Sequence, residues 1–232
     1  NRAIEFRNDL DIYFHNRAVA KRYLGKIHEA VADYGRALEL NSNSSTYYLG
    51  RGELWQILKE WQKAFDDYSR AIRADSRCAK AFYNRGYILF LGGDNIGAIE
   101  NYSRAIEIDP KDLSSYIYRG VTRMKVGEFR KAAEDYTQVI KLDPSHKRAW
   151  YNRGRACRKL GDPEGALRDY TEAIRLDPNY AEAWTNRGDM YRVMEDWESA
   201  IRDYQKALEV APEDWSYRKQ VESTLEKLRK KI

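Results

Sequence analysis

A period of 34 residues constrains the fold of this chain more than any other feature of its sequence. Counted from Asp11, six units follow one another without insertion or deletion and cover 204 of the 232 residues. Their ranges are 11–44, 45–78, 79–112, 113–146, 147–180 and 181–214. A regular repeat of this length is typical of solenoids, in which each unit buries its apolar face only against its neighbours.

Five positions of the unit, numbered from 1 to 34, carry one kind of side chain throughout. Position 8 is Ala or Gly, position 20 is Ala, position 27 is Ala or Val, and position 4 is aromatic. Position 24 is always tyrosine, as Tyr34, Tyr68, Tyr102, Tyr136, Tyr170 and Tyr204. Because positions 20, 24 and 27 share one face of a helix, the pattern predicts two closely packed antiparallel helices per unit, with aromatic rings filling the space between neighbours.

Glycine and proline mark where these helices should end. A glycine separates the two helices in four units, at Gly25, Gly93, Gly127 and Gly161. A proline follows the second helix in four units, at Pro110, Pro144, Pro178 and Pro212. Proline cannot continue a helix, so its place after each pair fits a helix end. Asp162 followed by Pro163 is in turn a typical helix start.

The pattern as a whole resembles the tetratricopeptide repeat family, through positions 4, 8, 20, 24 and 27 and the proline at position 32. The resemblance implies an all-α fold, a right-handed superhelical solenoid of antiparallel helix pairs. The chain departs from the family where Ser42 and Ser76 replace the proline at position 32. Position 11, usually aromatic in the family, holds Lys21, Leu89, Arg123 or Cys157 in four units. We expect these changes to alter local packing and to leave the fold intact.

The two ends of the chain extend the same frame. Residues 1–10 are expected to be the end of the second helix of an upstream repeat, because Ala3 falls on position 27. At least one further repeat would then precede this segment in the parent protein. Residues 215–232 are expected to form a C-terminal capping helix of the kind such arrays need for solubility. Its apolar residues recur every three or four positions, as Val221, Leu225, Leu228 and Ile232.

Composition narrows the classes of function. The 41 basic and 36 acidic residues are interleaved, which is typical of solvated helix faces. No apolar run approaches the roughly 20 residues of a membrane-spanning helix. Cys78 and Cys157 lie too far apart in sequence to suggest a disulfide framework or a zinc site, so we expect a reducing, cytoplasmic location. No phosphate-binding loop, zinc motif or nucleophile motif is present, and we predict no catalytic residue, metal or cofactor, and no enzymatic activity.

One charge pattern repeats in every unit. Position 7 is always arginine, and position 23 is aspartate in five units and Asn101 in the third. In a helical hairpin these two positions can face each other, which predicts an ion pair within each unit, for example between Arg119 and Asp135. We interpret the pattern as architectural rather than as a ligand contact.

Resemblance to the family places positions 2, 5, 6, 9, 12 and 13 on the concave surface, where a partner would bind. Position 6 is asparagine in four units, at Asn16, Asn84, Asn152 and Asn186. A side-chain amide carries both a donor and an acceptor, as a peptide bond does. We therefore predict that these solvent-facing asparagines hold the backbone of an extended peptide.

The other candidate contacts are aromatic and basic. The aromatic candidates are Tyr83, Tyr87, Phe90, Tyr118 and Tyr151, and the basic ones are Arg148, Arg155, Arg158 and Arg192. Together they favour an apolar, partly acidic peptide, although the aromatic rings could instead only pack between helices. Family members that clamp the carboxylate of chaperone C-termini use Lys at position 5 and Asn at position 9. Neither occurs in this chain, so that function is not expected.

The sequence thus predicts a scaffold that binds a protein or an extended peptide segment in a concave groove. One alternative is that the chain is the substrate-recruiting arm of a larger enzyme. A less favoured alternative is RNA binding by residues 113–146 and 147–180, whose net charges are +2 and +3. The net charge of −5 on residues 181–214 interrupts any basic stripe and weakens that alternative.

Overall fold

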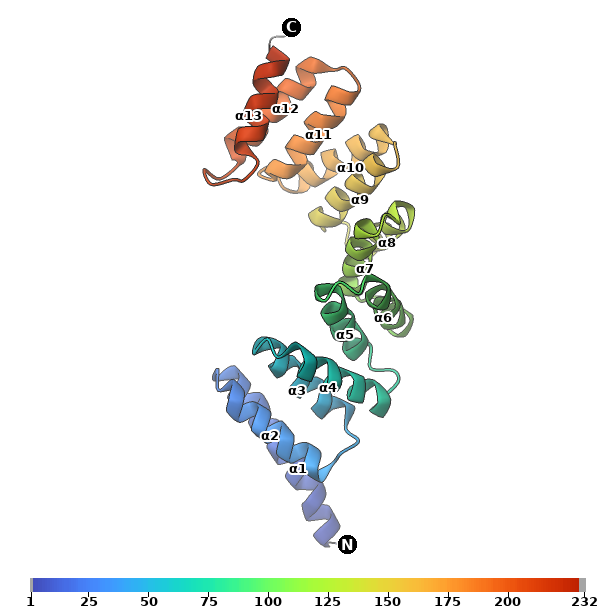
Figure 1. Cartoon of the computed structure of the whole chain (residues 1–232), viewed down its shortest axis with the longest axis vertical. Helices are drawn as coiled ribbons and strands as arrows, with labels where there is room; N and C mark the ends of the chain where they lie inside the picture. Colours follow the sequence, from blue (N-terminus) through green and yellow to red (C-terminus); the bar gives the residue numbers. More distant parts are fainter. Residues whose placement is uncertain (1, 230–232) are drawn as a thin grey trace. The chain divides into compact units, whose positions relative to one another are not determined.

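The computed structural model describes the backbone of residues 2–229 and the side chains of residues 10–229. This part of the chain is helical throughout and contains no β-strand (Figure 1). The helices fall into two compact bodies, which we call the N-terminal body, up to Tyr118, and the C-terminal body, from Arg119 onwards. The predicted all-helical fold is confirmed.

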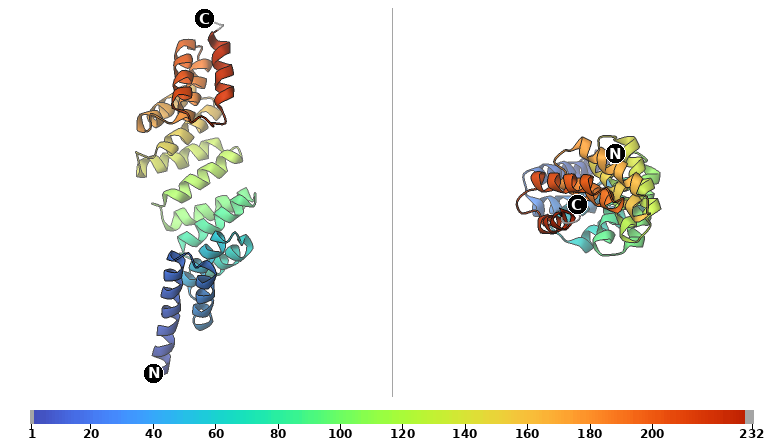
Figure 2. Two further views of the ribbon diagram at one scale, coloured as in Figure 1. Left: turned by 90° about the vertical axis from the view of Figure 1, so that its left-hand side faces the viewer. Right: turned by 90° about the horizontal axis from the view of Figure 1, so that it is seen from above.

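The helices follow the repeat frame in pairs. In order they are α1 (Arg2–Tyr23), α2 (Ile27–Leu40), α3 (Ser45–Ile57), α4 (Trp61–Ala74), α5 (Ala79–Leu91), α6 (Asn95–Ile108), α7 (Leu113–Lys125), α8 (Phe129–Leu142), α9 (Lys147–Lys159), α10 (Pro163–Leu176), α11 (Ala181–Val193), α12 (Trp197–Val210) and α13 (Arg218–Arg229). Within each body, the first and second helices of a unit pack as an antiparallel hairpin, and the next hairpin packs against it (Figure 2).

The ends of the second helices match the sequence. α6, α8, α10 and α12 all stop two residues before a proline. α2 and α4 end at the same position of the unit although serine replaces the proline there, so the proline is not required to end the helix. At the start of these helices, the carboxylates of Asp94, Asp162 and Asp196 accept hydrogen bonds from backbone amides three residues on, which caps helices that would otherwise leave these groups unpaired.

The core consists of the tyrosines at position 24 and the small residues around them. All six tyrosines are buried, and five of them are at most 1% exposed. In the five units with glycine at position 8, the tyrosine ring lies against that glycine; a Cβ atom added to Gly52 would lie 2.7 Å from the ring of Tyr68. Position 8 is therefore small because the ring occupies the space that a side chain would need.

Both ends of the described chain are helical. α1 runs without a break from Arg2 to Tyr23, so no loop separates residues 2–10 from the first unit (Figure 2). The sequence contains neither glycine nor proline there that would end a helix. The assignment of residues 1–10 to an upstream repeat stays a prediction. At the other end α13 starts at Arg218, with Val221, Leu225 and Leu228 buried as predicted, while Ile232 lies outside the described residues.

The turn between the two helices of a unit requires a left-handed backbone. Four units place glycine there, with φ between +73° and +86°, as the sequence predicted. The remaining two units place Lys59 and Glu195 there, each with φ of 60°. A residue with a Cβ atom is strained in this conformation, whereas glycine is not.

Replacing Lys59 by glycine is therefore expected to raise the free energy of unfolding by about 1 kcal/mol. The left-handed conformation costs a residue other than glycine about 1–2 kcal/mol, and part of the gain is offset because glycine makes the unfolded chain more flexible. Urea titration of the variant measures the change. As the matched control, Gly127→Ala should lower stability by a similar amount, and unchanged midpoints for both variants would contradict this explanation.

Candidate functional site

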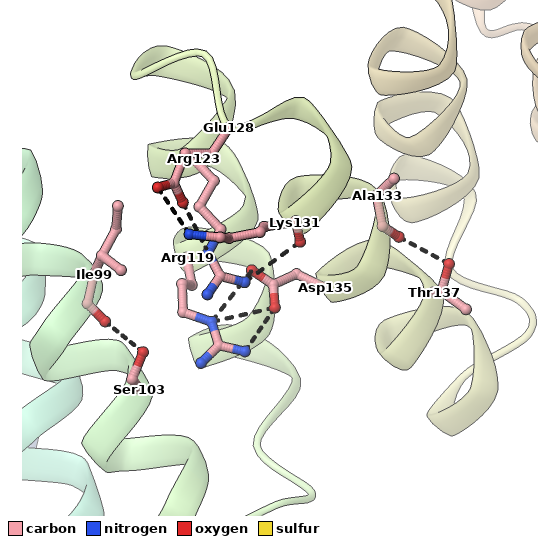
Figure 3. A network of polar contacts seen from close by, with 9 residues as sticks. All are labelled: Ile99, Ser103, Arg119, Arg123, Glu128, Lys131, Ala133, Asp135 and Thr137. Atoms are coloured by element: carbon pink, nitrogen blue, oxygen red, sulfur yellow. Dashed lines mark hydrogen bonds and ion pairs between the residues drawn. The ribbon is translucent and has the colours of Figure 1, made fainter. Parts of the chain in front are cut away.

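The predicted ion pair between positions 7 and 23 is present in every unit that has an aspartate. The distances between guanidinium nitrogen and carboxylate oxygen are 2.6–2.7 Å in the five units. The aspartate side chains are only 2–6% exposed, and each accepts hydrogen bonds from two nitrogens of its arginine (Figure 3). These pairs lie inside the helical hairpins, which supports the architectural interpretation. In the first unit, the hydrogen bonds from Arg17 lower the pKa of Asp33 below its usual 3.8.

The departures at position 11 have a structural reason. Lys21 and Arg123 stand where the family usually has an aromatic ring, and each reaches the aspartate of its own unit at 2.8 Å. Asp135 is thus held between Arg119 and Arg123 (Figure 3). A second cation at this buried carboxylate replaces the apolar packing that the aromatic residue would provide.

The third unit lacks the carboxylate. The Nε of Arg85 donates to the side-chain oxygen of Asn101 at 2.8 Å, so its positive charge is not neutralised at this position. Burial lowers the pKa of Arg85, whereas hydrogen bonds to aspartate raise the pKa of Arg51 and Arg153. The hairpin of α5 and α6 is therefore the one in which this guanidinium is partly buried without its usual counter-charge.

The same arginines also connect consecutive units. Arg85, Arg153 and Arg187 each donate a hydrogen bond to a hydroxyl at position 25 of the preceding unit, at 3.2–3.3 Å. The acceptors are Ser69, Thr137 and Thr171. Each arginine thus bonds forward within its own unit and backward to the unit before it.

Two cavities are lined by the positions that resemblance assigned to the binding surface. In the C-terminal body, a cavity of about 420 Å³ lies between α9, α11 and the start of α13 with the segment before it. It brings together four of the predicted contact residues, Tyr151, Arg155, Arg158 and Asn186. We call it the C-terminal cavity.

Some residues of the C-terminal cavity were not predicted. Trp215, Tyr217 and Gln220 form part of its wall, and the sequence indicated only a capping role for this segment. The guanidinium of Arg218 holds the segment in place, since it donates to three backbone carbonyls at the end of α12 and beyond, and the indole of Trp215 donates to Glu182 at 3.3 Å. The aromatic residues just before a capping helix could have indicated this wall.

The cavity's charges are only partly balanced. Arg158 bonds Asp189 at 3.2 Å and the side-chain oxygen of Asn186 at 2.9 Å. Arg155 lies over the ring of Tyr151 at 5.8 Å, and no carboxylate within the described part of the chain pairs with it. The cavity is thus lined by three cations, Arg155, Arg158 and Lys159, and two carboxylates, Glu182 and Asp189.

The N-terminal body has a cavity of about 460 Å³ on the same repeat positions, which we call the N-terminal cavity. Its wall combines Ile57, Trp61 and Tyr87 with Asn84 and a charged trio. In that trio Glu53 lies between Arg22 and Lys80, with both nitrogen–oxygen distances 2.5 Å. Two cations thus share one carboxylate, which leaves an excess of positive charge at the wall.

The predicted asparagines differ from one another in their surroundings. Asn16 is exposed and Asn152 is half-buried. Asn84 was expected to face solvent and is only 7% exposed, because α5 is enclosed by its neighbours, yet it lines the N-terminal cavity. No described residue hydrogen-bonds its amide. Asn186 is already bonded within the protein, to the hydroxyl of Tyr151 at 3.0 Å and to the carbonyl of Glu182 at 2.8 Å.

The predicted aromatic residues of the N-terminal body pack on one another. Tyr118 lies 5.5–6.5 Å, between ring centroids, from each of Tyr83, Tyr87 and Phe90. All four side chains are half-buried, and Tyr83 also contacts the core ring of Tyr102. Packing between helices thus accounts for much of this cluster, while Tyr87 also lines the N-terminal cavity.

The remaining predicted contacts lie outside the two cavities. Arg148 and Arg192 are both exposed, and Arg192 lies 3.9 Å from a carboxylate oxygen of Asp189. Cys78 and Cys157 are both free thiols. Within residues 2–229, no helix is both long and apolar enough to cross a membrane. Among the side chains described, no cluster of His, Cys, Asp or Glu is arranged to hold a metal ion.

Comparison with protein-family models agrees with the repeat frame. Residues 15–77 and 119–181 match a model described as tetratricopeptide repeat. Residues 79–112 and 181–214 match a second model with the same description, and its bounds coincide with two of the predicted units. A search of curated proteins finds no match.

Several solved structures have a similar fold. YrrB, described as a TPR protein with an unusual peptide-binding site, is 21% identical, with a TM-score of 0.73 over 86% of this chain and 98% of its own. PilF from Pseudomonas aeruginosa is 16% identical, with a TM-score of 0.74 over 94% and 99%. The C-terminal part of a TPR repeat-containing protein from Cytophaga hutchinsonii is 19% identical, with a TM-score of 0.78 over 93% and 88%. At such identities the likeness concerns the fold alone.

Proposed function

Because the chain belongs to the tetratricopeptide repeat family, we propose that it is a protein-interaction scaffold that binds extended, partly acidic segments of a partner protein. Membership of the family supports an interaction scaffold in general terms. We propose further that the partner segments bind in the N-terminal cavity and in the C-terminal cavity. Each cavity is a binding surface in its own right.

The observation that carries the proposal is the environment of Asn84. Asn84 as a residue is 7% exposed and lines the N-terminal cavity, and its side-chain amide has no hydrogen-bond partner among the described residues. Neither amide atom is fully buried, so both are accessible to a ligand, and asparagine is a mediocre helix former. A ligand that bonds the amide would offset that cost. A peptide bond is the complementary group, since it offers one donor and one acceptor.

The C-terminal cavity supports the acidic character of the partner. Arg155 and Lys159 stand one turn apart on α9, and neither has a carboxylate partner in the described chain. The aromatic rings of Tyr151 and Trp215 stand beside them, so an acidic residue next to an apolar one would fit this surface. Asn186 contributes to the wall but holds Tyr151 in place rather than offering a free amide.

The test is the affinity of the purified chain for an acidic 12-residue peptide selected from a random display library. Changing Asn84 to Ala should weaken binding by about 0.5–1.5 kcal/mol, because one amide contact is lost. Changing Asn84 and Asn152 together should weaken it further if the peptide also contacts Asn152. Changing Arg155 to Glu should weaken binding of the acidic peptide at the C-terminal cavity.

Asn179→Ala is the matched control, because Asn179 is exposed in a loop outside both cavities. It should leave the affinity unchanged. Circular dichroism checks that every variant keeps its helices. If affinity stays within about twofold for the asparagine and arginine variants alike, the peptide binds elsewhere on the chain and the proposal is wrong.

A further inference from the structure

A third cavity opens at the edge of the N-terminal body where α5 turns into α6. Its volume is about 310 Å³. The apolar part of its wall is formed by Trp61 and Phe65 of α4 and by Ile88 and Leu89 of α5, with Gly92 beside them. We call it the edge pocket.

The polar residues at the rim of the edge pocket already have partners. The amide of Gln62 donates to Asp66 at 3.0 Å, and the carboxylate of Asp94 accepts from the backbone amide of Gly97 at 2.9 Å. What the pocket offers to a ligand is therefore its apolar surface.

The repeat frame sets Gly92 apart. It occupies position 14 of its unit, and the other five units carry a large apolar residue at this position: Leu24, Leu58, Val126, Leu160 and Met194. Four of these side chains, all except Leu58, are 43–73% exposed, so this position stands at the surface of its unit. Gly92 lines the edge pocket and adds no side chain to it.

The backbone does not require glycine at position 92. Its φ and ψ are −75° and −6°, close to the −77° and −1° of Leu58 and the −83° and −4° of Leu160. A Cβ atom added to Gly92 would meet only the carbonyl oxygens of Ile88 and Leu89, at 3.5 and 3.6 Å, which is ordinary contact. A leucine would fit there, so the open space is not a consequence of the turn.

The surroundings of the edge pocket are suited to a partner protein. Trp61 is 40% exposed and lines both the edge pocket and the N-terminal cavity, so the two surfaces meet at its ring. Leu91 and Ile96, 50% and 73% exposed, extend the apolar surface. On the other side of Trp61, Arg22 and Lys80 outnumber Glu53 and would attract acidic residues.

We propose that the edge pocket binds a leucine or methionine side chain of a partner segment whose neighbouring residues are acidic. This inference rests on the proposed scaffold role and shares Trp61, Arg22 and Lys80 with the N-terminal cavity, but it does not depend on Asn84 or Arg155. Leucine and methionine suit the pocket because its wall of Trp61, Phe65, Ile88 and Leu89 is apolar.

Three labelled synthetic peptides test the pocket by fluorescence anisotropy. The first has a single leucine flanked by glutamates in a Gly-Ser background; the second has alanine for the leucine; the third has lysine for each glutamate. The wild-type chain is expected to bind the first peptide about tenfold more tightly than the second, since three carbon atoms enter a partly open pocket. It should also bind the third peptide more weakly than the first.

The decisive variant, Gly92→Leu, adds a side chain of the chain itself at the edge pocket. Gly92→Leu is expected to lower affinity for the leucine peptide to that of the alanine peptide while keeping the helical content and the unfolding midpoint. Trp61→Ala is a second variant, which should have the same effect by removing the wall. Equal binding of the leucine and alanine peptides by the wild type, or unchanged binding by Gly92→Leu, overturns the proposal.

Two further measurements separate the alternatives. Asn84→Ala should leave the leucine-to-alanine preference at about tenfold, even where it weakens both peptides, so the edge pocket and the proposed function can fail independently. Sedimentation velocity tests whether the occupant is a second copy of the chain. A wild-type dimer that Gly92→Leu converts to monomer would identify a second copy as the occupant and overturn the proposal in its present form.

Discussion

Tyr136→Ala is expected to lower the free energy of unfolding by about 3–5 kcal/mol, the range for removing a large aromatic side chain from a core. The ring of Tyr136 is 1% exposed and lies against Gly120, where an added Cβ atom would come within 2.9 Å of it. Urea or thermal titration of the purified chain measures the loss.

Tyr23→Ala is the matched control, since the side chain of Tyr23 is 87% exposed. It should change stability by less than about 0.5 kcal/mol. A loss below about 1 kcal/mol for Tyr136→Ala would show that the tyrosines at position 24 do not form the core of the array.

Asp135→Ala is the second change with a large expected effect, a loss of about 3 kcal/mol. The carboxylate is 2% exposed and pairs with both Arg119 and Arg123, so its removal takes the shared carboxylate away from two partly buried guanidinium groups, of which Arg123 keeps Glu128 at 3.8 Å. The double variant Arg119→Ala with Asp135→Ala should lose less free energy of unfolding than the two single variants together, and the difference should be about 1 kcal/mol or more. Additive losses would show that the pair is not coupled.

The third unit offers the reciprocal experiment. Asn101→Asp should stabilise the chain by about 1 kcal/mol, because it gives Arg85 the carboxylate that the other units provide. The amide of Asn101 now donates to the carbonyl of Gly97 at 2.7 Å, so the new carboxylate must turn toward Arg85, as Asp169 turns toward Arg153. Asp135→Asn, which imitates the third unit, should act in the opposite direction.

The fold could be predicted almost entirely from the sequence, because every unit repeats the same pattern of aromatic and small residues. Six tyrosines at one position and small residues opposite them leave few other ways to pack two helices. The bounds of the first and last helices could not be predicted as closely, because the residues there lie outside the six repeat units. α1 continues upstream as one helix because nothing between residues 2 and 10 interrupts it.

The candidate sites were only partly predictable, because periodicity gives the face of a helix but not what its neighbours do. Asn84 and Asn186 occupy the same position, yet the first lacks a partner and the second is bonded to Tyr151 and to Arg158. Those partners stand 35 and 28 residues away in sequence, so no local pattern reveals them. Trp215 and Tyr217 lie beyond the last repeat unit, so the 34-residue pattern could not predict that they form part of the cavity wall.

The arginines at position 7 bear on how a chain of this kind can change its length. The partners of Arg85, Arg153 and Arg187 lie 16 residues before them and 16 residues after them. Between residues 69 and 187, where position 25 is always Ser or Thr, a duplicated or deleted stretch of 34 residues therefore brings or removes one arginine together with one partner of each kind. Recombination between these units would then leave each of their arginines with both partners, so new array lengths can arise there in a single genetic event without compensating substitutions.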